Sequence, residues 1–103
     1  MFNINGIDWG IKLVSPNHPK LKRSDNSFAL GSCDNNTRLI YISESVPEGK
    51  LKKVLCHEIV HAAMFSYGII LTIDQEELIA DLIATYGEEI IIITNKIFNK
   101  IKG

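Results

Sequence analysis

The feature that most constrains this chain is the pentapeptide His57-Glu58-Ile59-Val60-His61, an H-E-x-x-H motif within a segment of helical periodicity. Apolar residues recur at helical spacing through this segment and Gly68 follows as a stop signal, which predicts a helix from about residue 50 to residue 66. Side chains four residues apart lie on one face of a helix, so both imidazoles can bind a single metal ion. The motif therefore predicts a zinc site, with Glu58 placed to take a proton from zinc-bound water.

A second helical segment supplies acidic residues that could complete this site. A catalytic zinc ion with two histidine ligands needs a third protein ligand and an open position for water. Glu77 and Asp81 stand one helical turn apart, away from the apolar residues of their segment. One of these acids could bind zinc while the other hydrogen-bonds a histidine ligand. The neighbouring Glu76 is interpreted as an ordinary first-turn acid that the helix dipole favours.

Together, His57-Glu58-x-x-His61 and Glu77-x-x-Ala80-Asp81 resemble the gluzincin arrangement of zinc metallopeptidases. The spacing is similar to that of the ImmA/IrrE-like metallopeptidases of phages and mobile elements, and SprT-like minimal domains are similar in architecture. The resemblance covers roughly residues 28–86. It implies one Zn²⁺ bound by His57, His61 and Glu77. It also implies that Asp81 contacts a histidine ligand and that Glu58 is the general base.

The activity that this resemblance implies is hydrolysis of peptide bonds in a polypeptide substrate. Zinc would activate a water molecule and polarise the carbonyl, and Glu58 would carry the proton to the leaving amine. One alternative is a zinc-binding but catalytically idle regulatory or protein-binding module, although metal binding alone does not require Glu58. Another is a different zinc hydrolase such as a deformylase, which pairs the motif with an upstream cysteine ligand, here Cys33.

The predicted fold class is α+β, and by the same resemblance it is a small zincin-like (minigluzincin) domain. An N-terminal antiparallel sheet of three to four strands is expected to pack on the motif helix and on the glutamate-bearing helix. Asn5-Gly6 predicts a two-residue hairpin, and strands are expected at 28–33 and 37–42. A capping box of Thr72 and Gln75 is expected to start the second helix. Residues 88–99 either continue that helix or form a separate one. The β-branched run at 90–94 could instead be a buried strand, but its charged flanks favour a helix.

The strand at residues 28–33 is the expected site of substrate binding. In gluzincin-like folds the corresponding strand lies at the sheet edge above the metal, where it can bind an extended peptide by β-augmentation. The small residues Ala29, Gly31 and Ser32 would let a substrate backbone approach closely. Tyr67, just after the motif helix, is a candidate to stabilise the transition state. Tyr86 and Arg38 are further candidates, and no motif distinguishes among the three.

Composition and charge narrow the remaining possibilities. The chain of 103 residues is 46% hydrophobic and 22% charged, as expected for a single globular domain spanning residues 1–103. A net charge of −1 argues against nucleic acid as a partner. Neither a signal peptide nor an apolar run long enough to span a bilayer is present, so no membrane partner and a cytoplasmic location are expected. Cys33 and Cys56 could form one disulfide at most, and the oligomeric state stays open.

Overall fold

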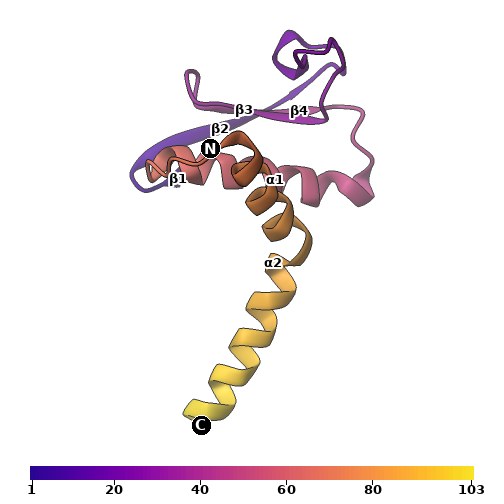
Figure 1. Ribbon diagram of the computed structural model, residues 1–103. Coiled ribbons are helices and arrows are strands. Elements are labelled where there is room, and N and C mark those ends of the chain that lie inside the picture. The colour runs from indigo at the N-terminus through magenta and orange to yellow at the C-terminus, as the bar shows by residue number, and fades with distance from the viewer.

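A computed structural model of the protein describes residues 1–103 and confirms the predicted α+β class (Figure 1). Four strands form one sheet, and two long helices follow them in the chain. In chain order the elements are β1 (Phe2–Ile4), β2 (Ile7–Val14), a 3-10 turn (Pro19–Leu21), β3 (Gly31–Asp34), β4 (Leu39–Ser43), α1 (Glu48–Ser66) and α2 (Ile73–Lys102). The motif histidines lie on α1, and the acidic candidates lie at the start of α2.

The sheet is mixed, with the strand order β1-β2-β4-β3. The hairpin of β1 and β2 turns at Asn5 and Gly6, both of which have positive φ, as their residue types predict. β3 and β4 form a second antiparallel hairpin, but β4 runs parallel to β2. The prediction of a fully antiparallel sheet was therefore wrong. The long connection after β2 reverses the chain and places β3 on the outside, so that β4 fits between β3 and β2.

β3 is an edge strand and β4 lies in the interior of the sheet, as predicted, but β3 is displaced along the chain. It begins only at Gly31, whereas residues 28–33 were expected. The preceding residues pair with the loop instead, because the Ala29 N–H donates to the Leu21 carbonyl at 2.8 Å and Phe28 forms an isolated bridge with Lys22. Ala29 therefore lies outside the exposed strand edge.

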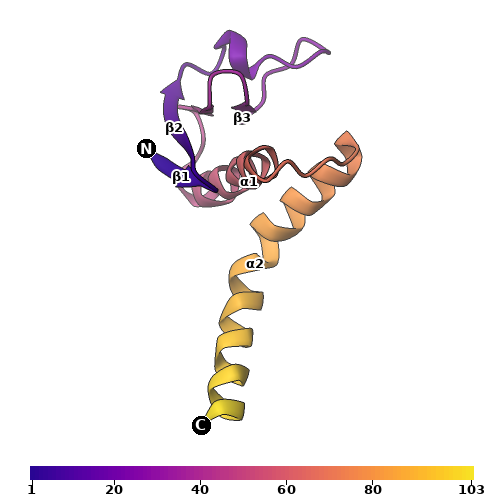
Figure 2. The same cartoon turned by 90° about the vertical axis from the view of Figure 1, so that its left-hand side faces the viewer.

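α1 packs across one face of the sheet, and a small apolar core fixes its position (Figures 1 and 2). Trp9, Ile40 and Ile42 from the sheet pack with Ala62 of α1, and all four side chains are fully buried or nearly so. The Trp9 indole N–H donates to the buried Ser66 hydroxyl at 2.8 Å. These contacts set both the rotation and the axial position of α1, so the motif faces β3 at the sheet edge.

α2 starts beside the end of α1 and then leaves the body of the protein. α1 ends at Ser66, with Gly68 at positive φ, and the predicted Thr72–Gln75 capping box is present at the start of α2. Ala80, the only buried residue of α2, lies where this helix packs on α1. α2 then continues unbroken to Lys102 and projects away from the sheet (Figure 2). Neither helix combines the length and hydrophobicity required to cross a membrane.

Candidate metal centre

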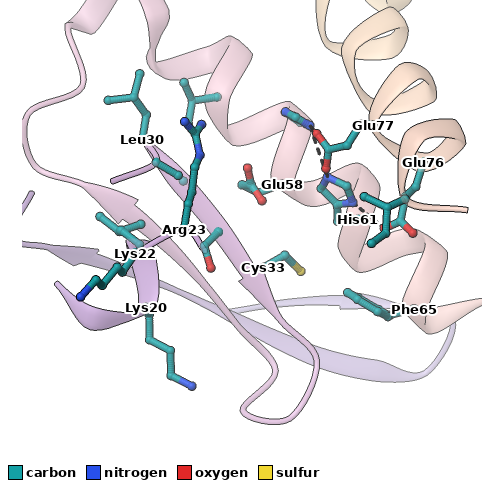
Figure 3. A pocket seen from close by; sticks show the side chains of 17 residues that line it. Lys20, Lys22, Arg23, Leu30, Cys33, Glu58, His61, Phe65, Glu76 and Glu77 are labelled. Atoms are coloured by element: carbon teal, nitrogen blue, oxygen red, sulfur yellow. Dashed lines mark hydrogen bonds and ion pairs between the residues drawn. The ribbon is translucent and has the colours of Figure 1, made fainter. Parts of the chain in front are cut away.

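α1 and α2 bring two imidazoles and a carboxylate to one point (Figure 3). The Nε2 atoms of His57 and His61 lie 3.3 Å apart. Glu77 reaches across from α2, with one carboxylate oxygen 3.1 Å from Nε2 of His57 and the other 2.9 Å from Nε2 of His61. The two histidines lie on one face of α1 as the motif predicts, and the start of α2 supplies the carboxylate.

These distances suit a metal ion. Two ligands each about 2.0–2.1 Å from a tetrahedral metal ion stand about 3.3 Å apart. The observed separation of the two Nε2 atoms, 3.3 Å, agrees with that spacing, and the carboxylate distances are slightly shorter. Two imidazoles and one carboxylate also match the donor set of catalytic His₂Glu zinc sites. The residues present therefore fit a metal ion held between α1 and α2.

The outward-facing nitrogens of the two histidines meet two different acids. Nδ1 of His61 lies 2.5 Å from Oε1 of Glu76, within hydrogen-bonding distance. Nδ1 of His57 lies 3.7 Å from Oδ1 of Asp81, which is too long for a hydrogen bond. A carboxylate on the non-ligating nitrogen fixes the tautomer and orientation of an imidazole. In this structure Glu76 makes that contact, whereas the contact predicted for Asp81 stays a prediction.

The interpretation of Glu76 as an ordinary first-turn acid was therefore wrong. Consecutive helix residues point about 100° apart, so Glu76 and Glu77 approach His61 from two sides. Glu77 meets the inner nitrogen of that ring and Glu76 meets the outer one. The sequence signal that could have revealed this role was the pair of adjacent acids at the helix start. The helix dipole explained that pair equally well.

Glu58 lies beside this cluster and is almost fully buried. It packs over β3 at Gly31, where an added Cβ would come within 3.0 Å of the Glu58 Cγ. Burial raises the pKa of Glu58 to about 7; His61 opposes this rise and the negative charge of Glu77 adds to it. The pKa of His57 is lowered, first by burial and then by the charge of His61. The His57 imidazole is therefore favoured in the neutral form that a metal ion binds.

A cleft of about 590 Å³ opens over this cluster, between β3, α1 and the loop that follows β2 (Figure 3). Its volume falls within the usual range for ligand sites. Lys22 and Arg23 of that loop line the cleft, although the loop carries no motif that predicts such a position. Neither side chain forms an ion pair within the chain, whereas Lys20 is paired with Asp34 at 2.6 Å.

The other predicted binding residues divide into two groups. Ala29, Gly31 and Ser32 line the cleft as expected. Tyr67 does not line the cleft: it follows the end of α1 and is 60% exposed. Phe65, which sequence reasoning did not select, lines the cleft instead.

The remaining candidates also lie apart from the metal cluster. Arg38 lies over the Trp9 ring at 5.5 Å, and Tyr86 lies further along α2, outside the cleft. Cys33 lines the cleft but does not belong to the donor cluster, and burial raises the pKa of its thiol to about 12. The donor cluster consists of His57, His61 and Glu77, so Cys33 does not take the place of the cysteine ligand of a deformylase-type site. Cys33 and Cys56 are both free.

A sheet packed on an H-E-x-x-H helix, with a glutamate from the following helix, defines a small zincin-like domain. The chain matches the family model of the peptidase M78 family, described as the IrrE N-terminal-like domain, over residues 10–95. It belongs to this family, which confirms the resemblance seen in the motifs. Comparisons with curated proteins and with solved structures found no significant match.

Proposed function

We propose that this protein is a zinc-dependent metallopeptidase in which His57, His61 and Glu77 hold one Zn²⁺ and Glu58 is the general base. The observation that carries the proposal is the convergence of three donor atoms beside a buried carboxylate, in a cleft that follows a sheet edge. Membership of a peptidase family supports a polypeptide substrate. The donor set supports zinc, because two histidines and a glutamate leave one position open for water.

In the proposed mechanism, each residue around the metal site has a separate role. Zinc, when bound, would polarise the substrate carbonyl and lower the pKa of water to about 7. Glu58 would accept the proton of the attacking water and pass it to the leaving amine. Its packing against Gly31 limits its movement, so the carboxylate stays beside the histidines. Glu76 holds the His61 ring in the tautomer that leaves Nε2 free to bind the metal.

The edge of β3 is the proposed docking site for an extended polypeptide. The Ser43 N–H donates to the Leu30 carbonyl, which sets the phase of the antiparallel ladder. Backbone groups alternate between the two sides of a strand, so those of Ser32 face β4 while those of Gly31 and Cys33 face the open edge. A substrate strand would therefore pair with Gly31 and Cys33, and the backbone groups of Ala29 and Ser32 are already used within the protein.

The test of the proposed chemistry is the Glu58→Gln variant, compared with the parent protein and with His57→Ala. We expect the parent protein to bind one zinc ion and to hydrolyse an unfolded protein. Glu58→Gln should bind zinc equally well and lose nearly all hydrolysis, because the general base typically contributes 10²–10⁴-fold. His57→Ala should lose the metal. Full activity in Glu58→Gln would remove Glu58 from the mechanism, and a zinc-loaded parent without activity would favour the catalytically idle module.

The test of the proposed docking edge is Cys33→Pro, with Cys33→Ala as the matched control. Both variants lose the thiol, but only proline removes the outward-facing N–H. We expect Cys33→Pro to lower kcat/KM for an extended peptide about 10-fold, the worth of one hydrogen bond, with zinc content unchanged. Cys33→Ala should keep nearly full activity. Equal activity in the two variants would place the substrate elsewhere.

A further inference from the structure

The far half of α2, residues 88–102, makes almost no contact with the rest of the protein. Every residue from Glu88 onward is exposed, and the one ion pair to the body joins Glu88 to Lys52 of α1. This half nevertheless carries seven large apolar side chains: Ile90, Ile91, Ile92, Ile93, Ile97, Phe98 and Ile101. A helix with this many exposed apolar residues has a surface that a partner can bury.

Part of this apolar surface belongs to a heptad pattern that begins before residue 88 and continues into the far half of α2. Ile83, Tyr86, Ile90, Ile93 and Ile97 alternate in spacings of three and four residues, and each is between 40% and 53% exposed. That spacing places them along one line of the helix, as in the seam of a coiled coil. We call these five residues the α2 seam. Ile92 has similar exposure, 47%, but its position in the repeat turns it away from the seam.

The charges beside the α2 seam indicate what covers it. Glu89 and Lys96 flank the seam on the same side, one heptad apart, and neither has an ion-pair partner within the chain. If two copies of α2 pair in antiparallel fashion, Glu89 of each copy faces Lys96 of the other. In a parallel pair Glu89 faces Thr94 and gains no partner. The charges are therefore complementary to a second copy of the same helix in the antiparallel orientation.

We propose that α2 forms an antiparallel two-helix interface with α2 of a second copy of this chain. In this arrangement Ile90 of one copy packs against Ile93 of the other, and Ile97 packs against Tyr86. The two-fold axis crosses the helices between Ile90 and Ile93, so both copies use the same surface and the assembly closes as a dimer. The far half of α2 projects away from the sheet and from α1 (Figure 2). Because β3 and α1 line the cleft, this arrangement leaves both clefts open to substrate.

The mass of the protein in solution, measured by sedimentation equilibrium over a range of concentrations, tests the interface. The parent protein should be a dimer. Ile93→Asp should raise the dissociation constant of the dimer at least about 100-fold, because it would place a charge at the centre of the buried seam. Ile92→Asp is the matched control and should leave the dissociation constant nearly unchanged. Zinc content and helical circular dichroism show whether each variant is folded. The proposal would be overturned if the parent protein is a monomer, or if Ile93→Asp and Ile92→Asp raise the dissociation constant of the dimer equally.

Charge reversal tests the antiparallel orientation separately. Glu89→Lys and Lys96→Glu should each weaken the dimer about 10-fold, since each places two like-charge pairs at the interface. The double variant should restore the affinity of the parent. If neither single reversal changes the dissociation constant of the dimer, the antiparallel orientation is wrong. A monomer that instead sediments with phosphatidylserine vesicles would show that a lipid surface, and not a second copy, covers the seam.

Discussion

The two halves of α2 belong to one unbroken helix but have different surroundings. In the near half, residues 73–87, Glu76 and Glu77 contact the histidines of α1 and Ala80 is fully buried at the helix contact. In the far half, residues 88–102, no side chain is buried. The near half is thus tied to the metal centre, whereas the far half is free to meet a partner.

This difference shows that helix formation and helix packing have separate physical causes. The backbone hydrogen bonds of α2 form within the helix itself. The helix continues through Gly87 and through the β-branched run at Ile90–Thr94, although these residues are weaker helix formers than alanine. At the two ends of α2, Asp74 and Glu76 in the first turn and Lys100 and Lys102 in the last turn complement the helix dipole. Burial instead depends on what lies across from each side chain. Variants at chemically similar positions in the two halves test this separation.

The largest expected effect is that of Glu77→Ala, compared with Glu89→Ala. Removing Glu77 deletes one of three donor groups, so we expect loss of stoichiometric metal and of any hydrolysis that depends on it. Removing Glu89 takes the same chemical group from the far half and should leave metal content unchanged. Metal analysis of the purified proteins measures both. Full metal content in Glu77→Ala would contradict the assignment of this ligand.

A smaller effect is expected at the acids that contact the outer histidine nitrogens. Glu76→Ala should weaken metal affinity some 10- to 100-fold, the usual cost of losing a carboxylate behind a histidine ligand. Asp81→Ala should weaken it less, because Asp81 lies 3.7 Å from Nδ1 of His57. Competition with a chromogenic chelator gives both affinities. A larger loss in Asp81→Ala than in Glu76→Ala would reverse the order of importance that the distances indicate.

The smallest expected effect concerns stability, in Ala80→Leu compared with Ile92→Ala. Ala80 is fully buried where α2 packs on α1, so three added carbon atoms should lower the free energy of unfolding by about 1–3 kcal/mol. Ile92→Ala in the exposed half should change it by less than about 0.5 kcal/mol. Urea denaturation of the metal-free proteins measures both. Equal stability losses would show that the far half packs on something within the same chain.

Sequence reasoning succeeded where a single element determines the outcome. The spacing of His57 and His61 on one helix face follows from the helical repeat alone. The Asn5-Gly6 turn and the capping box at Thr72 likewise depend only on neighbouring residues. The resemblance also selected Glu77, which the structure brings within 3.1 Å of both histidines.

It failed where separate elements meet. The place of β4 beside β2 depends on the path of a long loop, and the outward-facing groups of the β3 edge depend on the register with β4. The contact of Glu76 with His61 depends on the rotation of α2 about its own axis. None of these leaves a periodic signal in the chain, because each is set by contacts between residues far apart in sequence.

By itself, the sequence determined which residues could bind a metal ion and which segments become helices, because both depend on side-chain chemistry and on the geometry of a single helix. Only the tertiary structure decided which acid faces which nitrogen, which backbone groups of β3 face the open edge and which half of α2 stays uncovered. The buried core of Trp9, Ile40, Ile42 and Ala62 sets the rotation and position of α1 against the sheet. The packing of α2 on α1 at Ala80 then sets the direction in which Glu76 and Glu77 point toward the histidines.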